Sequence, residues 1–191
     1  MKNQLAKLAI TGGSCIVIVF TGVVYFAKKM DRDPDLAFAY TIQGVVRAEL
    51  VNDRQGAIDS YNQAIQLQPD RAISYYFRAK TQYRSGNKLG AIDDFNKAIQ
   101  LQPDYINAYI SRGVVRANIG NTREAITDYN RAIALKPNYA NSYYNRGIAK
   151  SDLGDRKNAI DDFNKAAKLF KKEGKANDYQ EAFDRANKLS K

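Results

Sequence analysis

Residues 103–137 read PDYINAYISRGVVRANIGNTREAITDYNRAIALKP, and the same pattern recurs before and after this stretch. A proline stands at each of its ends. The prolines of the chain are Pro34, Pro69, Pro103 and Pro137, at spacings of 35, 34 and 34 residues. Because proline interrupts a helix, prolines at even spacing indicate a repeated unit whose last helix ends at each of them.

Each unit predicts two short helices. In the third unit we expect one helix over about residues 105–119 and a second over about 122–135, since apolar residues recur there at helical spacing. Gly120 separates the two, where glycine relieves left-handed backbone strain. Small residues such as Gly113 and Ala125 indicate that the helices approach closely. One pair cannot bury its own apolar face, so the units are expected to stack.

The combination of period, glycines, alanines, aromatic residues and closing proline resembles the tetratricopeptide repeat family. Tyrosine stands where that family usually has tryptophan, at Tyr40, Tyr75, Tyr109 and Tyr143. The resemblance implies an all-α fold, a right-handed α-solenoid of four helix pairs. The pairs are expected over residues 37–71, 72–105, 106–139 and 140–173.

A last helix is expected after the repeats, over residues 176–191. Asn177 and Gln180 have the spacing of a capping box at its start. An apolar stripe follows along it, made of Tyr179, Ala182, Phe183, Ala186 and Leu189. We expect this helix to cover the end of the stack, as terminal repeats require. The alternative is an amphipathic helix that binds a partner.

Charged residues change together between the repeats. Three units carry arginine at one position of the first helix and aspartate at one position of the second, namely Arg78, Arg112 and Arg146 with Asp94, Asp128 and Asp162. In the first unit both positions change, to Gln43 and Ser60. We therefore predict a partly buried Arg–Asp pair that joins the two helices of units two to four.

The amino-terminal region has a different composition. Residues 8–27 contain no charged residue, and twenty apolar residues are long enough for a helix to span a bilayer. We predict a transmembrane helix over 8–27, between a flank at 1–7 and a hinge at 28–36. A cleavable signal peptide has a shorter apolar region. The anchor residues are Ile16, Val17, Ile18, Val19, Phe20, Val23 and Val24.

The charged residues on either side of the apolar run bear on which face of the membrane carries the repeats. Lys2 and Lys7 precede the apolar run, whereas Lys28, Lys29 and Arg32 follow it. The repeat region is basic, and its lack of a possible disulfide suits a reducing compartment. We expect the repeats of this single-pass protein on the cytoplasmic or stromal-type face.

In the tetratricopeptide repeat family, the first helix of each pair lines a concave groove. The resemblance therefore implies a protein-binding groove lined by Thr41, Val46, Glu49, Tyr76, Lys80, Tyr83, Arg84, Asn107, Ile110, Val114, Asn118, Asn141, Tyr144, Ile148 and Asp152. Tyrosine, amide and basic side chains suit an extended peptide. Chaperone-tail binders of the family use a carboxylate clamp of lysine and asparagine. Here Thr41 and Val46 correspond to clamp positions, so chaperone-tail binding is not expected.

Composition excludes several kinds of chemistry. The chain has no histidine and one cysteine, which excludes histidine-based acid–base catalysis and a Cys/His zinc site. Neither a phosphate-binding loop nor a dinucleotide-binding fingerprint is present. The net charge of +10 is spread along the chain and no nucleic-acid motif accompanies it. We expect no enzyme activity, cofactor, metal, small-molecule substrate or nucleic acid.

These features favour a membrane-anchored scaffold that binds proteins during assembly or stabilisation of a membrane protein complex. Small anchored repeat proteins that assist assembly of membrane complexes, photosystems included, have a similar architecture. A stable accessory subunit of such a complex, for example a photosynthetic one, is an alternative. Another is a repeat protein that faces the periplasm and works in envelope or pilus assembly.

Overall fold

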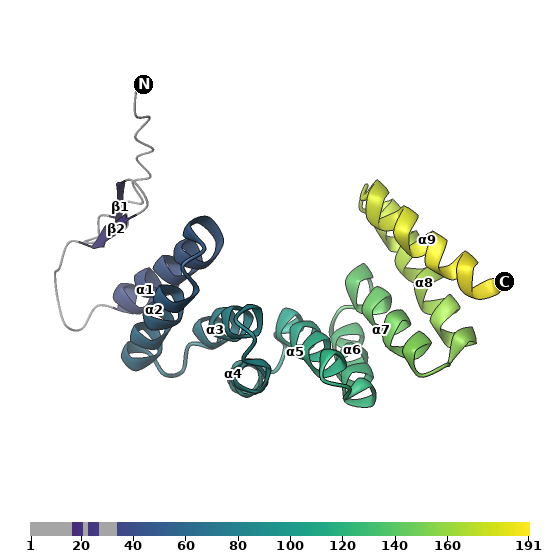
Figure 1. Cartoon of the computed structure of the whole chain (residues 1–191), viewed down its shortest axis with the longest axis horizontal. Coiled ribbons are helices and arrows are strands. Elements are labelled where there is room, and N and C mark those ends of the chain that lie inside the picture. Colours follow the sequence, from purple (N-terminus) through teal and green to yellow (C-terminus); the bar gives the residue numbers. More distant parts are fainter. Residues whose placement is uncertain (1–16, 21–22, 27–33) are drawn as a thin grey trace, which may run out of the picture. The chain divides into compact units, whose positions relative to one another are not determined.

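The computed structural model describes residues 17–20, 23–26 and 34–191 (Figure 1). The chain divides into two compact units, which we call the N-terminal unit, residues 1–87, and the C-terminal unit, residues 88–191. The boundary falls between the two helices of the second repeat.

The N-terminal unit contains the first repeat and half of the second. Its helices are α1 (Pro34–Val46), the π-helix η1 (Arg47–Val51), α2 (Arg54–Leu67) and α3 (Ala72–Arg84). Small side chains on α1 and α2 are fully buried, among them Ala37, Ala57 and Ala64. The Tyr61 ring is buried with them, and a Cβ on Gly44 of α1 would clash with this ring.

The first repeat holds its extra residue in a widened helical turn. The proline spacing of 35 residues in the first unit, against 34 in the others, implies one extra residue, and η1 at Arg47–Val51 accommodates it. A π-helix inserts a residue without breaking the helix. Asn52 then takes the left-handed conformation, with φ of 56°, and the side chain of Asp53 caps α2 by accepting from the Gly56 amide.

The C-terminal unit continues the pattern of paired helices. It comprises α4 (Lys88–Leu101), α5 (Ile106–Asn118), α6 (Thr122–Leu135), α7 (Ala140–Asp152), α8 (Arg156–Lys172) and α9 (Ala176–Ser190). A turn with a glycine at positive φ joins α5 to α6, where Gly120 has a φ of 88°. Alanine at position 120 would be strained at this φ angle, which explains why glycine occupies the turn.

Helix pairs close over a buried aromatic ring. Gly113 of α5 lies against the Tyr129 ring of α6, and a Cβ there would approach the ring to 2.6 Å. Ala125 and Ala132, on either side of Tyr129, are fully buried. Gly113 and Ala125 therefore allow the two helices to approach closely, as the sequence predicts.

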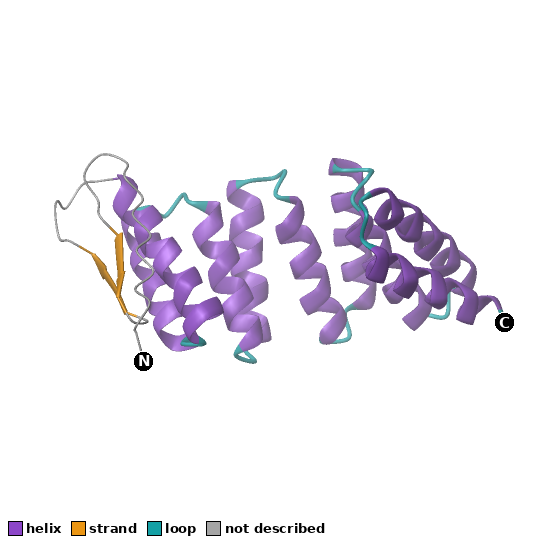
Figure 2. Cartoon of the chain, turned by 90° about the horizontal axis from the view of Figure 1, so that it is seen from above, coloured by secondary structure: helices purple, strands orange, loops and turns teal. Residues whose placement is uncertain are grey.

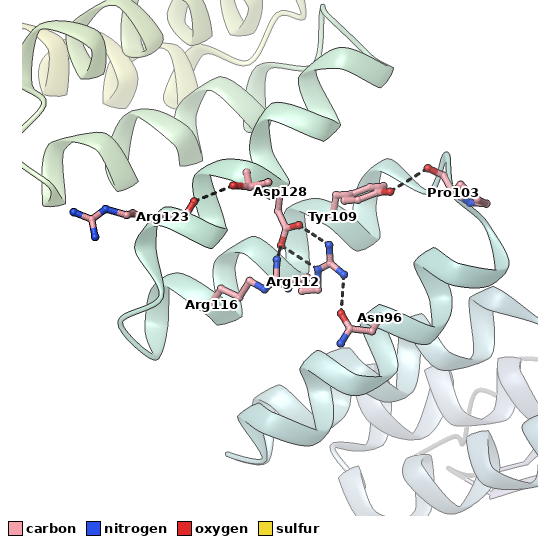
Figure 3. A network of polar contacts seen from close by, with 8 residues as sticks. Asn96, Pro103, Tyr109, Arg112, Arg116, Arg123 and Asp128 are labelled. Carbon is pink, nitrogen blue, oxygen red and sulfur yellow. Dashed lines mark hydrogen bonds and ion pairs between the residues drawn. The ribbon is translucent and has the colours of Figure 1, made fainter.

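The predicted Arg–Asp pair is confirmed in the third repeat (Figure 3). Arg112 donates from Nε and Nη2 to the two carboxylate oxygens of Asp128, at 3.0 and 2.6 Å. Arg116 donates to the same carboxylate at 2.8 Å. Arg112 also donates to Asn96 of α4 at 2.6 Å, so one guanidinium joins successive repeats.

The fourth repeat has the same arrangement. Arg146 donates to both oxygens of Asp162, at 2.8 and 2.6 Å, and to Asn130 of the preceding repeat at 2.6 Å. Lys150 takes the place of Arg116 and lies 2.7 Å from Asp162. Arg78 and Asp94 belong to different units, so the prediction is tested in the third and fourth repeats alone.

Helix α9 packs on α8. Ala182 and Ala186 of the expected apolar stripe are buried, whereas Phe183 is 40% exposed and stacks on Tyr179. The predicted capping box is wrong. The helix begins at Ala176, Lys175 occupies the N-cap without a side-chain bond, and Gln180 donates to Asp184 instead. Asn177 lies inside the helix, where it cannot act as the cap.

The predicted transmembrane helix over residues 8–27 is not supported. Its described parts are two antiparallel strands, β1 (Val17–Phe20) and β2 (Val23–Phe26), drawn in orange in Figure 2. Four of these eight residues are valine and one is isoleucine, and β-branched residues favour strands over helices. Ile16 and the other residues of the span lie outside the described residues. Among the helices that the structure describes, none is long and apolar enough to cross a bilayer.

We expect Asp162→Asn to lower the free energy of unfolding by about 2 kcal/mol or more, because it leaves Arg146 and Lys150 without a carboxylate in a largely buried site. The neighbouring Asp161 is exposed and provides the matched control. Asp161→Asn should change stability by less than about 0.5 kcal/mol. Urea denaturation of both variants measures this, and equal effects would contradict the structural role given to the pair.

Candidate protein-binding surface

The exposed face of α3 carries aromatic and basic residues in the N-terminal unit. Lys80 Nζ lies 5.9 Å from the centroid of the Tyr76 ring and 5.7 Å from that of Phe77. Tyr83 is half-buried and Arg84, one helical turn after Lys80, is exposed. These residues form a surface suited to polar and charged contacts with a partner.

Glu49 of η1 lies across from this face. Arg84 Nη1 donates to its carboxylate at 2.6 Å, and Lys80 Nζ lies 3.8 Å from the same oxygen. The side chain of Glu49 is 42% exposed, that of Arg84 is 43% exposed and that of Lys80 is 32% exposed. The structure thus brings together three of the residues that the sequence placed in the groove.

Thr41 is not part of an accessible groove, contrary to the sequence prediction. Its side chain is 1% exposed, and its hydroxyl bonds to the Ala37 carbonyl and to the Ser74 hydroxyl, at 2.9 and 2.8 Å. A small polar residue is tolerated in the buried contact between α1 and α3 because the Ser74 hydroxyl forms a hydrogen bond with the Thr41 hydroxyl. Val46, at the end of α1, is half-buried.

Several predicted groove residues of the C-terminal unit pack instead within the stack. Ile110 and Val114 of α5 contact the buried cluster of Ala125, Tyr129 and Ala149. Asn118 is exposed and its side chain donates to the Val114 carbonyl at 2.9 Å. Helical spacing could not separate these packing roles from contacts with a partner.

Asn107 lies beside an open surface hollow of about 290 Å³. Its side-chain oxygen accepts from the Tyr139 hydroxyl at 3.3 Å. Lys136 completes one wall, 4.9 Å above the Tyr139 ring. The hollow lies at the loops that precede α5 and α7.

Helix α9 covers the fourth repeat. The Tyr144 hydroxyl donates to Glu181, and the Arg185 guanidinium lies 5.5 Å from the centre of the Tyr144 ring. Asn141 and Tyr144 line a cavity of about 80 Å³ beneath α9. Ile148 packs on the buried cluster formed by α8 and α9, whereas Asp152 is exposed. Tyr144 is therefore a packing residue rather than an open contact.

The contact with α9 changes the ionisation of Tyr144 and of Glu181. Burial, and then the bond to Glu181, raise the pKa of Tyr144 from 10.0 to about 12. The hydroxyl that Tyr144 donates lowers the pKa of Glu181 below its ordinary 4.5. The pair is consequently a neutral phenol bonded to a charged carboxylate at neutral pH.

Some polar contacts were not anticipated. Asn62, Asn96 and Asn130 each accept a hydrogen bond from the arginine of the next repeat. Their spacing of 34 residues is visible in the sequence and could have revealed them. Glu181 and Arg185 lie beyond the repeats, where no such spacing exists.

Family models match most of the helical region. Models described as "Tetratricopeptide repeat" match residues 51–106 and 140–173, and one described as "TPR repeat" matches residues 115–154. Together they cover more than half of the chain. The chain belongs to the tetratricopeptide repeat family. The resemblance of the repeated sequence pattern to this family is therefore confirmed.

Several solved structures have a similar fold. A crystal structure of MamA is 28% identical, with a TM-score of 0.69, over 75% of this chain and 83% of MamA. The first repeat domain of Spaghetti (RPAP3), bound to the HSP90 peptide SRMEEVD, is 25% identical, with a TM-score of 0.62, over 66% of this chain and 99% of that domain. YrrB, titled a repeat protein with an unusual peptide-binding site, is 18% identical with a TM-score of 0.61 over 80% of this chain and 86% of YrrB, and shows the fold alone. No curated protein sequence matched this chain.

We expect Tyr144→Phe to lower stability at pH 7 by about 0.5–1.5 kcal/mol, because it removes the hydroxyl that bonds to Glu181. A lowered pKa means that the Glu181 carboxylate contributes stability above its ordinary value of 4.5 and loses it as pH falls through the folded-state pKa. The difference between the variant and the original chain should therefore shrink at pH 3. Urea denaturation at both pH values checks this, and an equal deficit at both would exclude the charged bond as its cause.

Proposed function

We propose that this protein is a scaffold that binds a segment of a partner protein on the first helices of its repeats. The observation that carries the proposal is the face of α3, where Tyr76, Lys80, Tyr83 and Arg84 remain accessible beside Glu49 on a stack of paired helices. Aromatic rings supply contact area at low entropic cost, and charged groups fix the register of a bound chain.

A similar repeat domain supports a peptide as the ligand. The Spaghetti domain was solved with a peptide bound to it. Thr41, one of the two positions compared with a chaperone-tail clamp, is buried in this chain. The proposal therefore concerns a peptide segment other than a chaperone tail.

The proposal extends to a membrane location. Residues 8–27 hold twenty uncharged residues, an apolar surface that a bilayer would cover. With the repeats on the cytoplasmic or stromal-type side, the scaffold would hold a partner during assembly of a membrane protein complex. The support for this part is the composition of the sequence.

We expect the full chain to float with vesicles in a density gradient and a variant lacking residues 1–30 to stay at the bottom, because the deletion removes the uncharged run. In right-side-out cells, protection of the carboxyl-terminal end from added protease supports the cytoplasmic side. Flotation of both proteins, or of neither, would refute attachment through residues 8–27.

We expect Tyr76→Ala to reduce recovery of the partner from gently solubilised membranes by about fivefold or more, because it removes a ring from the centre of the proposed contact. Tyr179→Ala removes a ring from α9, which packs on the fourth repeat and lies outside the proposed contact on α3, and is the matched control. Quantitative mass spectrometry of the recovered proteins measures both. Equal recovery with the two variants would move the interface away from α3.

A further inference from the structure

The N-terminal unit holds one of its own carboxylates against two cations. Glu49 accepts from Arg84 Nη1 at 2.6 Å and lies 3.8 Å from Lys80 Nζ. Lys80 and Arg84 are one turn apart on α3, so both cations face the same direction. In the part of the chain that the structure describes, neither cation forms an ion pair with a second carboxylate.

The backbone fixes Glu49 in this place. It lies on η1, whose shape is held at its end by the Asp53 amide bonded to the Arg47 carbonyl at 2.8 Å. The Arg47 side chain also donates to the Gly56 carbonyl at 3.0 Å, which ties the same turn to α2. Glu49 is therefore presented to α3 by the extra residue of the first repeat.

The charges of this site do not balance. Two cations face one carboxylate, which leaves an excess of one positive charge. All three side chains are between 32% and 43% exposed. An ion pair with this exposure contributes little to stability, since water competes for both groups. A carboxylate from another molecule could therefore take the place of Glu49 at small cost.

Aromatic rings border the cations. Lys80 Nζ lies within 6 Å of the centroids of the Tyr76 and Phe77 rings. A ring beside an ammonium group favours the cation and provides apolar surface for the residue next to a bound carboxylate. The site is thus built to receive an anion that is part of a larger chain.

We infer that Lys80 and Arg84 form a binding site for an acidic side chain of a partner peptide, and that Glu49 occupies this site when no partner is bound. The inference rests on the proposed function and specifies its ligand as a peptide segment with glutamate or aspartate. Glu49 competes with the ligand and so lowers its affinity.

The experiment uses two pools of fluorescein-labelled peptides, one with glutamate at alternate positions and a matched pool with glutamine there. Fluorescence anisotropy measures their binding to the full chain and to Glu49→Gln, Glu124→Gln and Arg84→Gln. Glu124 is an exposed glutamate of α6, so Glu124→Gln removes the same charge away from the site. Thermal denaturation confirms that each variant is folded.

We expect the chain to prefer the glutamate pool, Glu49→Gln to bind it about two- to fivefold more tightly, and Glu124→Gln to leave binding unchanged. Arg84→Gln should abolish the preference. Equal binding of the two pools, or equal gains from Glu49→Gln and Glu124→Gln, would overturn the inference and leave the proposed function standing. If neither pool binds, the inference falls together with peptide binding on α3.

Discussion

The fold depends on closing the first, third and fourth helix pairs over an aromatic ring of the second helix. Tyr61, Tyr129 and Phe163 are at most 2% exposed, and glycine faces each ring from the first helix. A Cβ at Gly113 would approach the Tyr129 ring to 2.6 Å, so a larger side chain there would hold these two helices apart. Because the ring fills the inner side of the pair, the other face of the first helix is left to carry polar groups.

Repetition within the chain explains how much the sequence could predict. Positions that recur with the repeat period revealed the helix pairs and the Arg–Asp contacts, since each repeat tests the assignment made in the others. The burial of Thr41 could not be predicted in this way, because it depends on a contact with Ser74 that occurs only between α1 and α3. The contacts of Tyr144 with α9 could not be predicted either, because α9 lies outside the repeat pattern. The length of residues 8–27 suits a helix, but their β-branched side chains also suit strands.

The first repeat departs from the others in a connected way. In the third and fourth repeats, Arg116 and Lys150 bind the buried aspartate. Arg47 has the same place in the first repeat, where Ser60 replaces the aspartate and bonds to Gln43. Without that carboxylate, Arg47 bonds to the Gly56 carbonyl and holds the turn that contains η1. The first repeat therefore lacks the ion pair to a buried aspartate, and it is the repeat whose η1 turn places Glu49 against α3.

Glu181 and Glu49 each contact a first helix, with different consequences. Glu181 belongs to α9, whose Ala182 and Ala186 are buried, so if its exposed side chain rotated away from Tyr144, the docked helix would still cover the fourth repeat. Glu49 contacts α3 through an exposed side chain, and only that side chain must rotate to leave. Since the cost of exchange scales with the surface that must be uncovered, the fourth repeat is closed by its neighbour while the α3 surface stays open to exchange. The docked helix α9 therefore covers the fourth repeat whichever way Glu181 points, whereas the Glu49 side chain alone stands over the cations of α3.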